Sequence, residues 1–302
     1  MKQQRLGSSD LFISEIGLGC MSLGTDESVA VSIVHEALDK GINFLDTADL
    51  YDEGRNEELV GKAIKGHRHE VILATKVGNR RVPAQEGWVW DPSKSYILSA
   101  VKESLKRLGT DYIDLYQLHG GTIEDPIEET IEAFEQLKKE GWIRHYGISS
   151  IRPNVIREYV SRSNIVSVMS QYSMLDRRPE EEVLDLLKGH NVSLIARGPL
   201  AKGILTSSGE KKLGEDYLDY SPDELRETRE KIVNLTNDSC TLGQTALRYV
   251  LDEPAVATAI PGASDLEQLR QNVSASGVPP LTLEVRAEIQ AITKANTYTS
   301  HR

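Results

Sequence analysis

Four side chains of complementary chemistry lie at or just after the ends of three short apolar segments. Asp46 ends the first segment and Tyr51 follows shortly after it, while Lys76 ends the second segment and His119 the third. A lysine ammonium beside a tyrosine stabilises the phenolate, and an aspartate beside the lysine holds the ammonium charged and oriented. A histidine ring N–H can donate to a carbonyl oxygen and orient a substrate. The set suits protonation of an oxygen as it becomes an alkoxide, and it needs a hydride from elsewhere.

The elements that must bring these groups together are indicated by a regular alternation along the chain. Short apolar segments, which we expect to be strands, alternate with amphipathic segments whose apolar residues recur at helical spacing, such as Ile97, Val101 and Leu105. The expected strands are 16–19, 43–46, 71–76, 113–119, 145–149, 166–171, 193–196 and 256–260, and the expected helices are 28–40, 57–65, 95–108, 127–140, 155–160, 181–188 and 242–251.

This alternation predicts a single α/β domain over residues 1–302, folded as a (β/α)8 TIM barrel. Strand–helix alternation requires parallel strands joined by right-handed crossovers, and eight such units close into a barrel. An open, doubly wound sheet is the alternative. A glycine-rich fingerprint after the first strand would favour it, but the segment Gly17-Leu18-Gly19-Cys20-Met21-Ser22 lacks the third glycine. In a barrel, Asp46, Lys76 and His119 all reach the carboxyl-end face, where barrel active sites lie.

Several segments do not belong to the eight strand–helix units of a barrel. Residues 5–14 contain Gly7-Ser8-Ser9-Asp10 and predict a hairpin that covers the amino-terminal end of the barrel. Residues 77–92 and 201–237 each follow a strand and are expected to overhang the carboxyl-end face, the second with an extra helix whose capping box starts at Ser221. We expect these two loops and the tail 295–302 to shape the pocket, and acidic pairs at helix starts, such as Glu57-Glu58, to face solvent.

Composition excludes several classes of function. The chain has 302 residues, 46 acidic against 35 basic, and a net charge of −11, which argues against a non-specific nucleic-acid binder. Its two cysteines form neither a disulfide framework nor a metal-ligand pattern, so we expect no metal. No apolar run approaches the roughly 20 residues that would cross a bilayer, and the N-terminus has no signal-peptide core. We therefore expect a cytoplasmic enzyme that acts on small molecules away from membranes.

The sequence resembles the aldo-keto reductase family, in particular its bacterial members, from residue 5 to residue 272. The resemblance implies a (β/α)8 barrel that reduces aldehydes or ketones with a nicotinamide cofactor, and it makes Asp46, Tyr51, Lys76 and His119 the catalytic tetrad with Tyr51 as general acid. The segments that carry it are Gly17-Leu18-Gly19, Asp46-Thr47-Ala48-Asp49-Leu50-Tyr51, Ala74-Thr75-Lys76-Val77, Asp114-Leu115-Tyr116-Gln117-Leu118-His119, Gly147-Ile148-Ser149, Gly198-Pro199-Leu200 and Ile260-Pro261-Gly262-Ala263-Ser264.

The same resemblance implies a set of cofactor contacts. Because some branches of the family bind NADP with a serine and a glutamine at the positions of Ser264 and Gln268, we expect NADPH rather than NADH. A helix start at Ser264 would add backbone N–H groups for the 2′-phosphate, although the segment 264–267 can also be a capping box. The implied contacts are Cys20, Met21 and Asp46 near the nicotinamide ribose; Ser149, Ser150 and Gln171 at the carboxamide; Gly198, Leu200, Lys202 and Gly203 at the pyrophosphate; and Gly262, Ser264, Gln268, Gln271 and Asn272 at the adenosine end.

One position departs from the family pattern. Relatives commonly place an aromatic residue before the Gly198-Pro199-Leu200 segment, stacked on the nicotinamide, whereas this chain has Arg197. A guanidinium is planar and can stack, but it adds a positive charge. It could disfavour NADP⁺ relative to NADPH, or it could contact the substrate or an acidic neighbour.

We expect the substrate, a small carbonyl compound, to contact Met21, Tyr51, Trp88, Trp90 and His119. A loop tryptophan can equally pack on its own scaffold, and Cys20 and Met21 can be packing residues. Two other functions stay open, namely a nucleotide-binding regulatory subunit with negligible turnover and a barrel with unrelated chemistry such as a lyase. Both a monomer and a homo-oligomer are compatible with the sequence.

Overall fold

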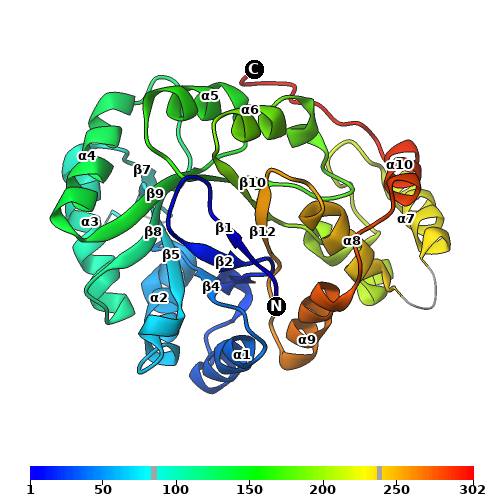
Figure 1. Ribbon diagram of the computed structural model, residues 1–302, viewed down its shortest axis with the longest axis horizontal. Coiled ribbons are helices and arrows are strands. Elements are labelled where there is room, and N and C mark those ends of the chain that lie inside the picture. Colours follow the sequence, from blue (N-terminus) through cyan, green and yellow to red (C-terminus); the bar gives the residue numbers. More distant parts are fainter. Residues whose placement is uncertain (83–86, 237–239) are drawn as a thin grey trace.

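Eight parallel strands form the centre of the computed structural model, which describes residues 1–82, 87–236 and 240–302 (Figure 1). Neighbouring strands pair in the order β3, β4, β5, β8, β9, β10, β11, β12, and parallel bridges from Ile16 to Ala259 and from Gly19 to Gly262 close the ring. The predicted (β/α)8 barrel is therefore confirmed. The strands are β3 Leu18–Gly19, β4 Phe44–Asp46, β5 Ile72–Val77, β8 Ile113–Leu118, β9 Ile143–Ser149, β10 Ser167–Gln171, β11 Ser193–Arg197 and β12 Val256–Ile260.

Helices surround this ring, and their positions agree with the periodicity of the sequence (Figure 1). The strand β9 begins two residues earlier than expected, because Gly141 ends the preceding helix in the left-handed conformation (φ +82°) and the chain enters the strand almost at once. The helices that cover the barrel are α1 Glu27–Asp39, α2 Arg55–Ala63, α3 Lys94–Leu108, α4 Ile127–Glu140, α5 Pro153–Arg162, α6 Val183–Gly189, α8 Leu242–Leu251 and α9 Leu266–Ser274.

A hairpin covers the amino-terminal end of the barrel, as the sequence predicts. Its strands β1 (Gln3–Arg5) and β2 (Phe12–Ser14) pair antiparallel, and the hairpin lies across the ring in Figure 1. Leu6, Leu11 and Ile13 are buried in one cluster with residues from inside the barrel. The turn approaches the barrel closely, since a Cβ on Gly7 (φ +53°) would lie 2.2 Å from the Val166 carbonyl oxygen.

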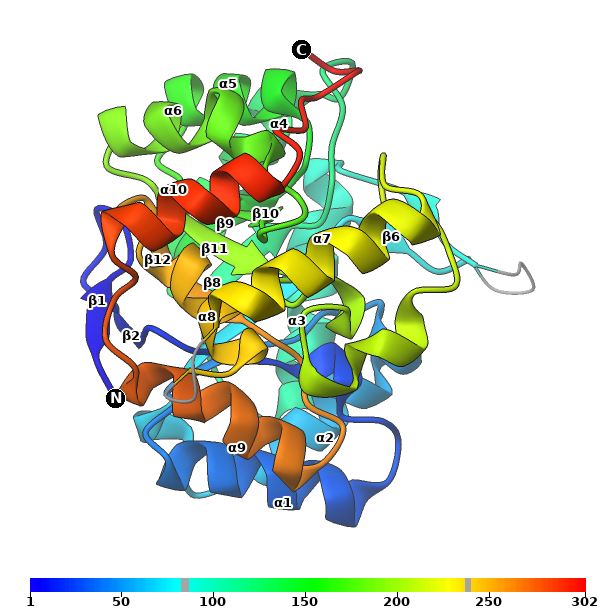
Figure 2. The ribbon, with the colours of Figure 1, turned by 90° about the vertical axis from the view of Figure 1, so that its right-hand side faces the viewer.

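Further segments lie at the opposite end. A short antiparallel ribbon, β6 (Asn79–Arg80) with β7 (Val89–Trp90), follows β5, and α7 (Pro222–Leu235) follows β11. Figure 2 shows the hairpin β1–β2 at one end of the molecule and β6 and α7 toward the other. The capping box predicted at Ser221 is present, with the Ser221 and Glu224 side chains each bonded to the other residue's backbone N–H. Parts of the two predicted insertions, residues 83–86 and 237, lie outside the described residues.

The C-terminal tail after α10 (Leu283–Ile292) lies against the outer helices. Asn154 donates its backbone N–H to the His301 carbonyl at 2.9 Å, and the Arg302 guanidinium bonds to Glu181. None of residues 295–302, all of which the structure describes, lines the large cavity at the carboxyl-end face. The tail therefore does not line the pocket itself, because it is held against α5, against the segment that precedes α6 and, through Asn296, against Asp219 of the insertion after β11.

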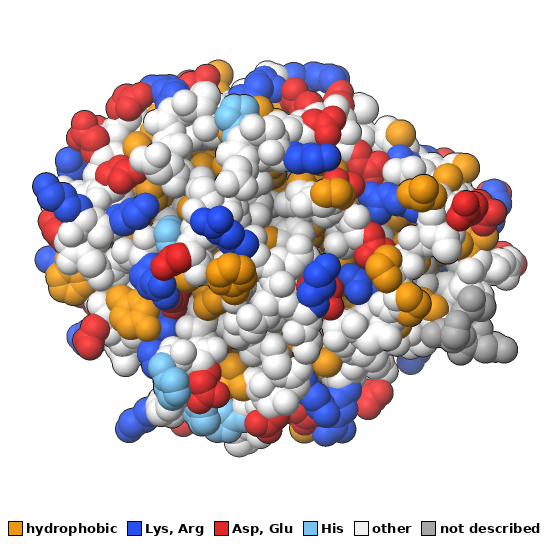
Figure 3. All heavy atoms as spheres, viewed as in Figure 1, with side chains coloured by type: hydrophobic (Ala, Val, Ile, Leu, Met, Phe, Trp, Pro, Cys, Tyr) orange, Lys and Arg blue, Asp and Glu red, His pale blue; other side chains and the backbone are white. Residues whose placement is uncertain are grey.

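The surface shows no segregation of charge over the face that carries the hairpin. Figure 3 shows acidic and basic side chains intermixed there. Among the described residues, no helix is long and apolar enough to cross a membrane. Within the same residues, no group of three or more His, Cys, Asp or Glu side chains is arranged to hold a metal ion.

The hairpin allows a matched test of the amino-terminal closure. Ile13→Ala removes a fully buried side chain, so we expect the free energy of unfolding to fall by about 2–5 kcal/mol. Phe12→Ala, on the adjacent residue whose side chain is 55% exposed, is expected to cost less than about 1 kcal/mol. Urea unfolding of the two variants measures both values. Equal losses would show that the hairpin does not close the barrel core.

Candidate active site

A cavity of about 1040 Å³ opens at the carboxyl ends of the barrel strands. Asp46 and Lys76 reach it from the ends of β4 and β5, and His119 reaches it from the residue that follows β8. Tyr51 comes from the turn beyond β4. Two non-glycine residues in the left-handed region, Asp52 (φ 46°) and Glu53 (φ 60°), continue this turn and fix where the tyrosine lies. The structure thus brings all four predicted catalytic residues together in one cavity.

Lys76 is the centre of the site. Its Nζ donates to Asp46 Oδ2 at 2.7 Å, to the Thr47 carbonyl at 2.8 Å and to Tyr51 Oη at 3.1 Å. Gln117 donates to the other Asp46 oxygen at 3.1 Å. Lys76 has no exposed surface, and a buried ammonium is tolerated only when its donors are bonded and its charge is paired.

Burial and charge pairing together set the protonation of this group. Burial lowers the pKa of Lys76, but Asp46 and Tyr51 more than offset it, so that the pKa of Lys76 is raised and the ammonium persists. Burial also raises the pKa of Tyr51, and the opposing charge of Lys76 does not reverse this shift. Lys76 therefore acts in the expected direction, since it lowers the pKa of Tyr51, but burial outweighs it and the net shift is upward. The phenol keeps its proton and is available as a donor.

His119 is held as a neutral ring beside Tyr51. The two rings meet edge to face, with centroids 6.0 Å apart and an interplanar angle of 86°. Burial, assisted by the charges of Lys76 and Arg197, lowers the pKa of His119 to about 3. Its Nδ1 is buried without a hydrogen-bond partner among the described residues. When the proton is on Nε2, the buried Nδ1 carries only a lone pair, and the Nε2–H group is the one donor of the ring.

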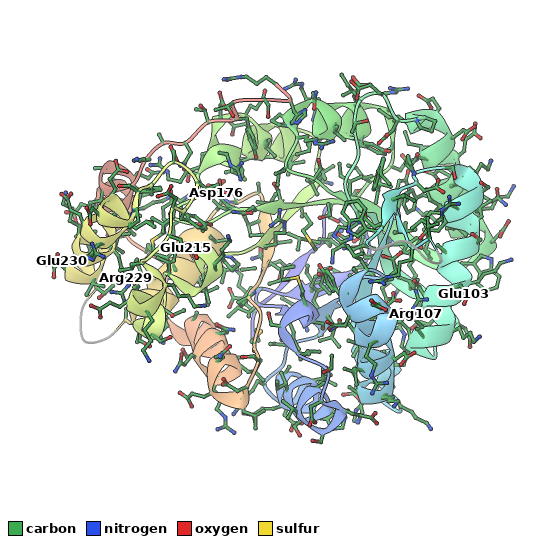
Figure 4. All side chains as sticks on the ribbon, turned by 180° about the vertical axis from the view of Figure 1, so that it is seen from behind. Glu103, Arg107, Asp176, Glu215, Arg229 and Glu230 are labelled. Carbon is green, nitrogen blue, oxygen red and sulfur yellow. The ribbon has the colours of Figure 1, made fainter. Side chains whose placement is uncertain are left out.

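A second buried ion pair supports strand β5 behind Lys76. Glu57 accepts from Thr75 Oγ1 at 2.6 Å and from Arg107 Nε at 2.7 Å, and Figure 4 shows Arg107 on the barrel side of α3. Glu57 is fully buried. The expectation that the Glu57-Glu58 pair faces solvent is wrong for Glu57, because α2 turns this carboxylate inward to Thr75 and Arg107.

The two tryptophans expected to contact substrate have different environments. Trp88 is 51% exposed at the cavity. Trp90 also lines the cavity, but its Nε1 donates to both Asp125 oxygens at 3.0 Å, and its ring lies against Gly78 and Gly120. A Cβ on Gly78 (φ +127°) would come within 2.5 Å of the ring. Trp90 therefore packs on its own scaffold, the alternative that the sequence left open, and supports the backbone next to His119.

Most of the predicted cofactor contacts also line this cavity. Two do not: Cys20 is fully buried with its Sγ directed to the Leu18 carbonyl, and Ser264 lies off the wall. Sequence reasoning missed Asn79, Arg152, Lys212 and Tyr217, which line the cavity from the connections that follow the barrel strands, whose conformation no local motif indicates. The predicted contacts that line it are Met21, Asp46, Ser149, Ser150, Gln171, Arg197, Gly198, Leu200, Lys202, Gly203, Gly262, Gln268, Gln271 and Asn272.

The start of α9 differs from the sequence expectation. Asp265, not Ser264, is the N-cap, and its carboxylate accepts from the Gln268 N–H at 2.8 Å. The Ser264 backbone N–H and hydroxyl both donate to the Gln268 side-chain oxygen at 3.2 Å. The capping box predicted from Ser264 is therefore wrong: the helix is capped by the next residue, through its side chain. A phosphate at this helix start would have to displace the Ser264–Gln268 contact in order to use both donors.

Loop 198–221 borders the other side of the cavity and is anchored from α7. Arg229 donates to the carbonyl oxygens of Ile204 and Thr206 at 3.2 and 3.0 Å, whereas its neighbour Glu230 lies at the outer edge of the molecule (Figure 4). Lys212 Nζ donates to the Lys202 carbonyl at 2.7 Å within the same loop. These bonds place two lysines on the cavity wall.

Comparison with known proteins identifies the family. The model of the aldo/keto reductase family matches residues 15–294. This chain belongs to that family. The resemblance inferred from the sequence is therefore confirmed, and the lining of the cavity can be considered as that of an aldo/keto reductase.

Relatives of this reductase match most or all of its length. An uncharacterized oxidoreductase of Bacillus subtilis (strain 168), YqkF, is 58% identical over 307 residues that cover 100% of both chains. The aldo-keto reductase YhdN of the same organism is 32% identical over 293 residues, covering 89% of this chain and 87% of that one. Among solved structures, the holo form of aldo-keto reductase AKR11C1 from Bacillus halodurans matches with a TM-score of 0.96 and 58% identity, covering 100% and 99% of the two chains. The glycerol dehydrogenase AKR11B4 from Gluconobacter oxydans matches with a TM-score of 0.86 and 25% identity, covering 96% and 94%.

The lowered pKa of His119 gives this reductase a testable dependence of stability on pH. In the unfolded chain a histidine binds a proton below a pKa of about 6.5, whereas folded His119 stays neutral down to about pH 3. Below pH 6.5 the unfolded state therefore binds the extra proton, and the stability linked to His119 is lost as the pH falls from 6.5 toward 3.

We expect urea unfolding between pH 7 and pH 4 to show a steeper loss of stability in the wild type than in His119→Asn. Contributions from the other histidines cancel in this comparison. Identical slopes for the two proteins would contradict the neutral, buried state of His119.

Proposed function

We propose that this protein is an NADPH-dependent reductase that converts the carbonyl group of a small aldehyde or ketone to an alcohol, with Tyr51 as the general acid. The observation that carries the proposal is the contact of the buried Lys76 ammonium with both Asp46 and Tyr51 Oη. When a nicotinamide cofactor is bound, it would supply the hydride for the carbonyl carbon. As the carbonyl oxygen gains negative charge, it takes the proton of Tyr51 and becomes the hydroxyl of the product.

The chain's own residues control that proton. Tyr51 keeps it in the resting site, because burial raises the pKa of the phenol. Once the proton has left, the phenolate is paired with the ammonium of Lys76, which is already within 3.1 Å. His119, neutral and adjacent, donates its N–H to the same carbonyl oxygen and so orients the substrate. Solvent then restores the proton to Tyr51.

The residues along the cavity suit a dinucleotide with several negative charges. Lys202 and Lys212 lie on the wall near the end that we assign to the phosphates. Asp46 is the one carboxylate among the described lining residues, and Lys76 neutralises it. Both lysines face the pyrophosphate, which NADPH and NADH share, so we propose that the preference for NADPH comes from the Ser264 and Gln268 donors at the adenosine end. Ser149, Ser150 and Gln171 would hold the carboxamide, Gly198, Leu200 and Gly203 would follow the pyrophosphate, and Gly262, Ser264, Gln268, Gln271 and Asn272 would contact the adenosine end.

The free cysteines Cys20 and Cys240 suit a reducing compartment, and we propose that the reaction takes place in the cytoplasm. The competing function, a nucleotide-binding subunit with negligible turnover, leaves the assembled proton donor unexplained. Measuring NADPH binding and turnover together distinguishes the two functions.

The direct test follows absorbance at 340 nm after the purified protein is mixed with an activated aromatic aldehyde and either NADPH or NADH. We expect the absorbance to fall with NADPH. We expect kcat/KM for NADH to be at least about tenfold lower than for NADPH, because NADH lacks the 2′-phosphate and the contacts that this group makes. Tight NADPH binding by fluorescence without any turnover across a broad carbonyl panel would instead support the regulatory function. Equal efficiency with NADH would contradict the proposed preference for NADPH.

A further inference from the structure

We propose that Asp49 is a positioning residue for the proton donor: while its buried carboxyl group is neutral, Tyr51 gives up its proton readily, and when the group ionises the reaction slows. The inference rests on the proposed function and adds a residue that acts on the reacting groups from outside the cavity. The chemical step itself is unchanged, because Asp49 neither contacts the substrate nor gives it a proton.

Asp49 lies in the turn that connects two catalytic residues. It follows Asp46 by three residues and precedes Tyr51 by two, and the Tyr51 backbone N–H closes the turn by donating to the Ala48 carbonyl at 3.2 Å. Asp49 is not among the residues that line the cavity, and its Oδ1 is buried without a hydrogen-bond partner among the described residues. The carboxyl group therefore lies behind the catalytic turn, where an unpaired charge costs free energy.

The two cations that act on Asp49 are already paired with other carboxylates. Arg107 donates to Glu57 at 2.7 Å, and Glu57 is fully buried. Lys76 donates to Asp46, also at 2.7 Å. An ionised Asp49 is therefore a third carboxylate beside two cations, and the interior holds it more easily when it is neutral.

Asp49 shares this interior with the hydroxyl of Tyr116 on β8. Tyr116 Oη is buried without a hydrogen-bond partner among the described residues. Burial, followed by the charge of Asp49, raises the pKa of Tyr116. The titratable groups that face Asp49 are Glu57 from α2, Tyr96 and Arg107 from α3, Tyr116 from β8 and Lys76 from β5.

The charge of Asp49 changes near neutral pH, whereas the charges of the neighbouring catalytic groups do not. Burial, assisted by the negative charge of Glu57, raises the pKa of Asp49 to about 7. Burial also raises the pKa of Tyr51 above its ordinary value of about 10 and lowers the pKa of His119 to about 3. A change of rate around pH 7 is therefore expected to report on Asp49.

The ionised carboxylate acts on the reaction through Lys76. The charge of this ammonium acts on Asp49, and its Nζ lies 3.1 Å from Tyr51 Oη. Proton transfer to the substrate leaves a phenolate, which the positive potential of Lys76 stabilises. A further carboxylate nearby cancels part of that potential, so the phenolate is less stable and the proton is given up more slowly. Neutral Asp49 leaves the potential intact.

The experiment follows single-turnover hydride transfer from saturating NADPH between pH 5.5 and pH 9, with an activated aromatic aldehyde that has no ionisable group. Asp49→Asn replaces the carboxyl group by a neutral group of the same shape. Asp49→Ser is a second neutral variant, which serves if the amide is not accommodated. Asp39→Asn removes an exposed carboxylate from the end of α1 and is the matched control.

We expect the wild-type rate to fall by about 3- to 10-fold as the pH rises, because a shift of one unit in the pKa of Tyr51 changes the proton equilibrium tenfold and the rate follows part of that change. The midpoint should lie near pH 7. Asp49→Asn should keep the low-pH rate of the wild type throughout, and Asp49→Ser should show no fall around pH 7. Asp39→Asn should follow the wild type at every pH.

Infrared spectra report on the same carboxyl group without any turnover. The difference between the spectra of the wild type and Asp49→Asn at pH 6 should contain the carbonyl band of a protonated carboxylic acid. This band should be absent from the same difference at pH 8.5, because Asp49 has then lost its proton.

Other outcomes overturn the proposal. A fall around pH 7 that persists in both neutral variants would assign the titration to another group, such as Tyr51 itself. A wild-type rate that does not depend on pH would show that Asp49 does not act on the proton donor. Lower rates in the neutral variants at every pH, with the wild-type midpoint, would indicate a structural role only.

Failure of this proposal and failure of the proposed function are distinguishable. If the wild type reduced no aldehyde, the proposed function would fail, and the infrared band would still show whether Asp49 holds a proton at pH 6. If turnover were normal but the band were missing at pH 6, the role of Asp49 would be refuted and the proposed function would stand.

Discussion

The buried ammonium of Lys76 is the constraint on which the site depends. A charge without any exposed surface must have each of its donors bonded, and here the partners come from β4, from the residue after it and from the turn that carries Tyr51. Those bonds fix the distance between ammonium and phenol before any substrate arrives. The same low-polarity surroundings keep the phenol protonated and His119 neutral. The burial of Lys76 and its neighbours therefore sets both the geometry and the protonation states that carbonyl reduction needs.

The barrel strands place the buried residues of the site, and the loops add the contacts around them. Parallel strands deliver Asp46 and Lys76 to one edge with little freedom, because register and strand length fix where each strand ends. The loops contribute the less regular parts, including the Trp90–Asp125 contact that supports the backbone beside His119 and the lysines placed by the anchored loop before α7. The result is a cationic cavity in an acidic protein, which attracts anionic ligands to one place without making the whole surface basic.

Much of the fold could be predicted from the sequence, because the information is local. Apolar segments of strand length and helical periodicity indicate the strands, the strand order and the face on which Lys76 and His119 meet. The predictions that were wrong concern how deeply a group is buried, or which of two neighbouring residues makes a given hydrogen bond. The inward carboxylate of Glu57 depends on burial, while the choice of Asp265 over Ser264 as N-cap depends on a backbone conformation that either residue could have adopted.

The central claim is that Tyr51 gives its proton to the substrate oxygen, and a single-turnover measurement on Tyr51→Phe tests it most directly. The preformed complex with NADPH is mixed rapidly with an aldehyde, and Tyr112→Phe, which changes a tyrosine at the amino-terminal end of β8 outside the cavity, serves as the control. The account predicts that hydride transfer slows by about 100-fold or more in Tyr51→Phe, while the NADPH dissociation constant changes by only a few-fold and the control keeps its rate. Retention of most of the rate by Tyr51→Phe would contradict it.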